Sequence, residues 1–171
     1  YTSSAVDNRP GTTDIIALRY AGLQTLSFSQ AIANPVFAYV SLNGNGYGFD
    51  QDFDILSVGG SDGNACGYWG CGTSYKQVAT VNGKTEYQLL GTGEPHGTLQ
   101  FKGTFDTVNW RSLSNEYWNG FTVGVQETAV EYCTANPTAP GCTPNGVPEP
   151  ASLALLGLGL AGLAVGRRRK G

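Results

Sequence analysis

The sequence predicts an all-β domain, an antiparallel β-sandwich of jelly-roll type, followed by a C-terminal hydrophobic helix. Composition is the first observation behind the sandwich: the 171 residues include 25 Gly, no Met and only 13% charged residues. Thr, Val, Tyr, Phe and Trp are plentiful, and such side chains suit pleated, half-buried surfaces. The second observation is that turn signals recur about every 8–12 residues, the spacing of a sandwich. The length fits one compact domain with appendages.

Ten short strands are expected along the body. Val36–Leu42 is a continuous run, as expected for a central strand. Asn82-Gly83 stands between two strand-like runs and predicts a type I′ hairpin turn. No helix of convincing period is found, although residues 26–33 could form one helical turn. The strands lie near residues 15–20, 24–28, 36–42, 47–50, 53–58, 75–81, 84–90, 98–102, 105–111 and 117–126, and the hairpin pairs Val78 with Tyr87 and Thr80 with Thr85.

The chain divides into three parts. Residues 1–131 form the predicted ectodomain, with a core of about residues 12–128. Residues 132–146 form a Pro-rich stalk with almost no large apolar side chain. Residues 147–171 form a tail that differs sharply in composition from the rest.

The tail has the composition of a membrane span. Residues 151–166 contain one polar residue, Ser152. A helix of this length spans about 24 Å, against a hydrocarbon core of about 30 Å. The aliphatic stems of the basic residues that follow reduce the difference between the length of the helix and the thickness of the hydrocarbon core. These residues hold that end on the cytoplasmic side of the inner membrane, and they are Arg167, Arg168, Arg169 and Lys170. The alternative, a buried core helix, is disfavoured because Gly costs about 1 kcal/mol against Ala in a soluble helix.

A specific resemblance follows from the order of these parts. The motif Val147-Pro148-Glu149-Pro150, then an apolar helix, then an Arg-rich end, resembles the PEP-CTERM sorting signal. The resemblance implies processing by an exosortase in a bacterium that makes exopolysaccharide, and transient anchoring in the inner membrane. Glu149 is then a recognition residue for the processing enzyme. The chain begins at Tyr1 without a signal peptide, which an exported protein needs, so we expect that one was removed or that the sequence is truncated.

The body is acidic. Residues 1–147 hold six Lys and Arg against twelve Asp and Glu, a net charge of −6. Such a surface repels nucleic acid, and the aromatic residues are not interleaved with basic ones. A nucleic-acid partner is therefore not expected.

The four cysteines predict two disulfides in an exported protein. We prefer the local pairs among the three arrangements, with two competing interpretations, a zinc site and free thiols. The C-x4-C and C-x8-C spacings fit no common zinc module, and His96 is the one histidine. The preferred pairs are Cys66 with Cys71 and Cys133 with Cys142.

Alternating carboxylates form a candidate calcium site, Asp50, Asp52 and Asp54. In a strand these three share one face while Phe49, Phe53 and Ile55 point inward. Two carboxylates with a loop carbonyl could ligate Ca²⁺. The alternative is a solvated face that discourages edge-to-edge pairing. Calcium is the one cofactor the sequence indicates.

Two further groups point to carbohydrate. An aromatic ring beside small residues can serve as a platform for a sugar ring, and the candidate glycan-binding residues are Tyr68, Trp69 and Trp118. Glu94 and His96 flank Pro95 and could form an acid–base pair, with Glu116 as a second carboxylate for glycoside hydrolysis.

We therefore expect an exported surface or matrix protein that associates with exopolysaccharide without catalysis. The alternative is a secreted glycan-active hydrolase that uses Glu94, Glu116 or His96. A cleft with two carboxylates favours the enzyme, and an open aromatic face favours binding.

Overall fold

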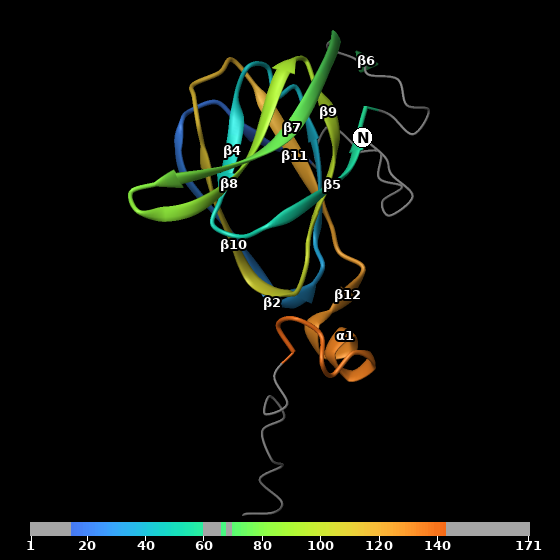
Figure 1. Cartoon of the computed structure of the whole chain (residues 1–171). Helices are drawn as coiled ribbons and strands as arrows, with labels where there is room; N and C mark the ends of the chain where they lie inside the picture. The colour runs from blue at the N-terminus through green and yellow to red at the C-terminus, as the bar shows by residue number, and fades with distance from the viewer. Residues whose placement is uncertain (1–14, 60–65, 68–69, 143–171) are drawn as a thin grey trace, which may run out of the picture.

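The computed structural model describes residues 15–59, 66–67 and 70–142, and these form two antiparallel sheets and one short helix (Figure 1). The first sheet has the order β1-β11-β3-β9-β5. Its strands are β1 (Ile16–Leu18), β3 (Val36–Val40), β5 (Phe53–Val58), β9 (His96–Phe101) and β11 (Asn119–Gly124). The predicted all-β class is confirmed for this part of the chain.

The second sheet has the order β12-β2-β10-β4-β8-β7-β6. The hairpin predicted at Asn82-Gly83 joins β7 to β8, and both residues have the positive φ, 52° and 76°, that a type I′ turn requires. Val78 pairs with Tyr87 and Thr80 with Thr85, as predicted. The strands are β2 (Gly22–Ala33), β4 (Gly46–Phe49), β6 (Cys66–Gly67), β7 (Gly70–Val81), β8 (Lys84–Gly93), β10 (Thr104–Ser112) and β12 (Glu127–Thr128).

An aromatic cluster joins the two sheets. The Phe37 ring of β3 stacks on that of Phe121 in β11, with centroids 4.7 Å apart. It also meets the rings of Phe49 and Trp110, from the second sheet, edge to face at 6.3 Å. Such pairs add about 0.5–1.5 kcal/mol beyond the apolar area they bury. Since the rings come from both sheets, the cluster holds the sheets face to face.

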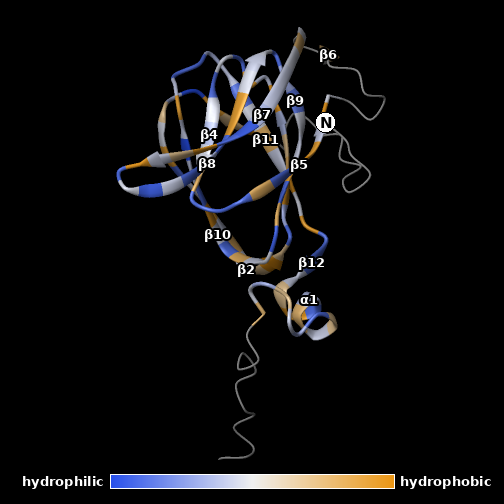
Figure 2. Cartoon of the chain, in the orientation of Figure 1, coloured by the Kyte–Doolittle hydropathy of each residue, from blue (hydrophilic) through white to orange (hydrophobic). Residues whose placement is uncertain are grey.

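Residues 26–33 form a strand, so the suggested helical turn is wrong. β2 continues to Ala33 because Ile32 and Ala33 pair with both β10 and β12. Exposed and partly buried residues alternate along β2 up to Phe28. Figure 2 shows that the strands of the body contain both hydrophilic and hydrophobic residues. The period of two, and not a helical period, governs this segment.

Helix α1 (Ala129–Ala135) was not predicted. Seven residues are too few to show a 3.6-residue period, but Thr128 and Glu131 form a capping box that marks its start. The disulfide Cys133–Cys142 ties α1 to the segment that follows it. The Thr104 hydroxyl donates to the carbonyl of Gly141 at 3.0 Å, so this segment lies against the start of β10.

Both predicted disulfides are present, Cys66–Cys71 and Cys133–Cys142. Cys66 and Cys71 are partners in the β6–β7 ladder. Each bridge therefore joins residues that local structure has already brought together, which explains why short spacing was a sound guide to the pairing.

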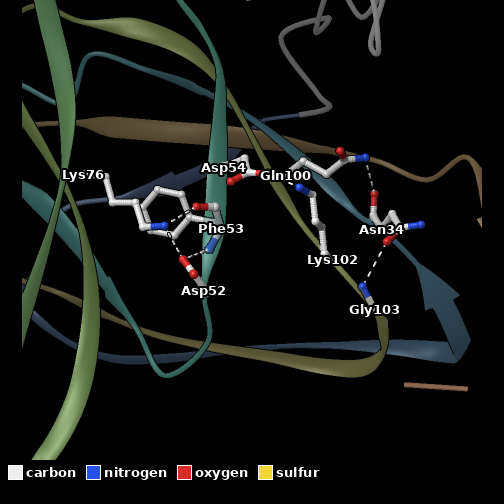
Figure 3. Close-up of polar contacts among 8 residues, drawn as sticks. All are labelled: Asn34, Asp52, Phe53, Asp54, Lys76, Gln100, Lys102 and Gly103. Carbon is white, nitrogen blue, oxygen red and sulfur yellow. Dashed lines mark hydrogen bonds and ion pairs between the residues drawn. The ribbon is translucent and has the colours of Figure 1, made fainter. Parts of the chain in front are cut away.

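Lys76 links the second sheet to the first. Lys76 of β7 donates to the Asp52 carboxylate and, at 2.7 Å, to the Phe53 carbonyl at the start of β5 (Figure 3). Its ammonium lies 5.2 Å from the Phe53 ring centroid and 5.6 Å from that of Tyr87. By contrast, Lys102, which follows β9, pairs with Asp54 of β5 in the same sheet, and its side chain is 69% exposed.

Replacing Lys76 by Ala should therefore lower the stability of the fold, by about 1–2 kcal/mol for the lost hydrogen bonds and cation–π contacts. The matched control is Lys102→Ala, which removes an exposed ion pair and should leave the melting temperature unchanged. Thermal unfolding followed by near-UV circular dichroism measures both. Equal shifts for the two variants would contradict the link between the sheets.

Candidate functional site

The candidate site is a depression at one end of the two sheets, with a volume of about 310 Å³. Three connections meet there, β3 to β4, β8 to β9 and β10 to β11. They meet because Val40, the last residue of β3, pairs with His96 on one side and Gly120 on the other. The end depression is lined by Ser41, Asn43, Glu94, Glu116, Tyr117 and Trp118.

Glu94 is held by contacts from both sheets. The Ser41 hydroxyl donates to its carboxylate at 2.5 Å, and its backbone N–H donates to the carbonyl of Cys71 at 3.0 Å. Gly72 makes this approach possible, because a Cβ there would lie 2.5 Å from the nitrogen of Pro95. The Cys66–Cys71 hairpin therefore fixes the loop that presents Glu94.

Glu116 lies within a network of amides. Asn119 donates to its carboxylate at 2.9 Å, and the Asn45 side chain and the Asn43 backbone also donate to it. Burial raises the pKa of Glu116, the three hydrogen bonds oppose the rise, and the charge of Glu94 adds to it. The influence of Glu94 shows that the two carboxylates share one electrostatic environment.

The network continues into the core. The Tyr47 hydroxyl donates to the carbonyl oxygen of the Asn119 side chain at 2.6 Å. Burial raises the pKa of Tyr47, and the charge of Glu116 raises it further. Tyr47 therefore stays a neutral donor, and Asn119 is oriented so that its NH₂ group faces Glu116.

Two aromatic rings complete the depression. Tyr117 is 86% exposed, and the Arg19 guanidinium lies 5.4 Å from its ring centroid. Trp118 is half-buried. The other predicted glycan-binding residues, Tyr68 and Trp69, lie outside the described residues.

His96 is a buried residue of the first sheet. It opens β9 and is 4% exposed, and it is not part of the lining of the end depression. Of the three residues proposed for hydrolysis, the structure brings Glu94 and Glu116 to one depression and places His96 in the sheet.

Two of the three calcium candidates, Asp52 and Asp54, form other interactions (Figure 3). Asp52 accepts from Lys76 and from its neighbour's backbone N–H at 2.7 Å. Asp54 pairs with Lys102, and that hydrogen bond lowers the pKa of Asp54. Asp50 precedes β5 and lies outside the strand. Within the ranges that the structure describes, no group of three or more His, Cys, Asp or Glu side chains is placed to hold a metal ion.

Several residues of the end depression were not among the predicted glycan-binding or hydrolytic residues. They include Ser41, Asn43 and Tyr117, while Asn45 and Asn119 act through Glu116. Only the meeting of three connections makes them neighbours. The arrangement offers fixed carboxylate acceptors, a hydroxyl and amides beside two aromatic faces, a combination that can bind a polar ring.

Comparison with known proteins identifies the tail. Residues 146–170 match the family model of the PEP-CTERM protein-sorting motif. No curated protein and no solved structure matches the chain. The motif residues Val147–Pro150, the apolar segment 151–166 and the basic residues Arg167–Lys170 lie outside the described residues. In the part that the structure describes, no helix has the length and apolar character to cross a membrane.

The motif implies export, anchoring in a membrane and then cleavage by an exosortase. The chain is thus a protein that carries a PEP-CTERM protein-sorting motif at its C-terminal end.

Proposed function

We propose that an exosortase releases this protein to the cell surface or extracellular matrix, where its body binds polysaccharide without cleaving it. The observation that carries the binding function is the end depression, in which Trp118 and Tyr117 lie beside Glu94 and Glu116. Sugar hydroxyls donate to carboxylates, and aromatic faces pack on the C–H face of a sugar ring. This supports a binding site for a polar ring.

The position of the depression supports the same function. The last described segment contacts the body at Thr104, close to the turn in which Asn34 and Gly103 hydrogen-bond. The depression lies beyond Val40, at the end of β3 opposite to Val36. A body attached to a membrane at its C-terminal end would therefore present the depression away from that membrane.

We also propose that the two sheets form a jelly roll. Four strand pairs are nested, which is how a long hairpin folds into a jelly roll, and they are β3 with β11, β4 with β10, β5 with β9 and β7 with β8. We assign residues 1–131 to the ectodomain, 132–146 to a stalk and 147–171 to a removable tail with a membrane helix at 151–166.

A glycan hydrolase is the second candidate function. The observation that favours it is the raised pKa of Glu116 beside a second carboxylate, since glycosidases pair a protonated acid with an ionised partner. Against it, three amide donors already engage the Glu116 carboxylate, which leaves little capacity for a proton shared with a substrate.

Replacing Trp118 by Ala should weaken binding of the polysaccharide from the native host by about tenfold, because the ring supplies the apolar contact. Tyr132→Ala, in α1 at the other end of the body, should leave affinity unchanged. Affinity electrophoresis in gels containing that polysaccharide measures both. Equal mobility of Trp118→Ala and the wild type would exclude the end depression as the binding site.

Glu116→Gln separates the two functions. The pKa of Glu116 is higher in the folded protein than in the unfolded chain. Protonated Glu116 therefore contributes stability below its ordinary pKa, and this contribution is lost as the pH rises through the raised pKa. The neutral variant should therefore melt at or above the wild-type temperature at pH 7 and match it below about pH 4. A binding protein releases no reducing ends in either form. Release by the wild type that stops in Glu116→Gln would establish the hydrolase.

Replacing Glu149 by Ala should leave uncleaved precursor in the inner membrane, because the span is intact while a motif residue is changed. The basic end opposes translocation, since a charged residue at a helix centre costs roughly 2.5–3.5 kcal/mol on insertion scales. Glu127→Ala, in the body, is the control and should be processed normally. Mass spectrometry of surface material tests this, and an intact Arg167–Lys170 end on wild-type surface protein would contradict cleavage.

A further inference from the structure

A second concave site lies on the outer face of the seven-stranded sheet. It has a volume of about 310 Å³ and runs over β2, β10, β4 and β8 to the β7–β8 turn. Leu23, Arg111 and Gly48 are partners across three strands. They alternate with Trp110 and Phe49, which are buried in the core, so this row points outward. We call this site the outer groove.

A planar ion pair forms its floor. Arg111 donates to Glu86 through Nε at 3.1 Å and through Nη2 at 2.8 Å. Gln88 also donates to Glu86, at 2.7 Å. A Cβ at Gly48 would lie 2.4 Å from the Glu86 carboxyl carbon, so the glycine leaves the space in which this carboxylate lies.

The floor retains hydrogen-bonding capacity. Nη1 of Arg111 donates to none of the described residues, and the Arg111 side chain is 35% exposed. A carboxylate offers about four acceptor sites, and Glu86 uses three of them, so about one remains beside these donors. A ligand hydroxyl both donates and accepts, so neighbouring hydroxyls match an edge on which donor and acceptor alternate.

The charges of the groove cancel. Asp50 and Glu86 face Lys84 and Arg111 among the lining residues. A phosphate or uronate polymer finds no net positive field there, and a polycation finds no net negative one. The groove therefore selects an uncharged polar ligand, unlike the end depression with its two glutamates.

A peptide is a poor fit for the same surface. Peptides add to exposed strand edges through backbone hydrogen bonds, but β10, β4 and β8 each have a hydrogen-bonded strand on both sides. Leu23, 83% exposed, and Val81 instead offer small apolar contacts to the C–H face of a ring.

We propose that the outer groove is a separate binding site for a short segment of uncharged saccharide, recognised by the Arg111–Glu86 pair. It shares no lining residue with the end depression. The two binding proposals can therefore be tested independently. A body with both sites could join two polysaccharide chains.

The test uses the full chain in a detergent without a sugar headgroup, titrated calorimetrically with four neutral probes, the hexasaccharides of cellulose, mannan, xylan and chitin. At least one should bind. Arg111→Lys keeps the charge but loses the planar fork, so its affinity should fall about tenfold. Leu23→Ser alters an exposed wall residue without risk to folding and should also weaken binding.

Two controls keep the outcome specific. Leu56→Ser, on β5 of the other sheet, should leave binding unchanged, and Arg111→Lys should weaken binding as much in a Trp118→Ala background as in the wild type. The proposal is overturned if none of the four probes binds at millimolar concentration. It is equally overturned if Arg111→Lys and Leu23→Ser bind like the wild type, or if Trp118→Ala alone abolishes binding.

Discussion

The stacking of Phe37 on Phe121 is the contact on which the rest of this structure depends. It aligns β3 with β11 in the centre of the first sheet, and through Phe49 and Trp110 it reaches the second sheet. The same alignment places the ends of these strands together, so that Ser41 and Trp118 line one depression. Burial of aromatic rings in the middle of the fold therefore determines which polar residues meet at its end.

The end depression concentrates negative charge that the fold must accommodate. Burial disfavours ionisation of Glu116, and the charge of Glu94 disfavours it further. Amides from Asn43, Asn45 and Asn119 offset part of that cost. Asn119 is in turn oriented by Tyr47, a fully buried residue of the core. The polar site is thus anchored on the hydrophobic core through one tyrosine hydroxyl.

The end depression and the outer groove, both proposed to bind saccharide, differ in their electrostatics. The end depression combines carboxylates with the rings of Tyr117 and Trp118, whereas the outer groove balances two acids with two bases on the face of the seven-stranded sheet. Gly48 is central to the second arrangement, since any side chain there would displace Glu86. The end depression lies at the opposite end of β3 from the turn beside which the last described segment contacts the body.

The sequence by itself determined the features that depend on neighbours in the chain. The Asn82-Gly83 turn set the register of β7 and β8, short spacing indicated both disulfides, and the order of parts in residues 146–170 identified the sorting motif. Tertiary structure alone decided what depends on distant segments. It buried His96, paired Asp52 and Asp54 with lysines, and brought Glu94 to Glu116. The physical reason is that turn chemistry and side-chain period act over a few residues, while the meeting of three loops follows from how two sheets pack.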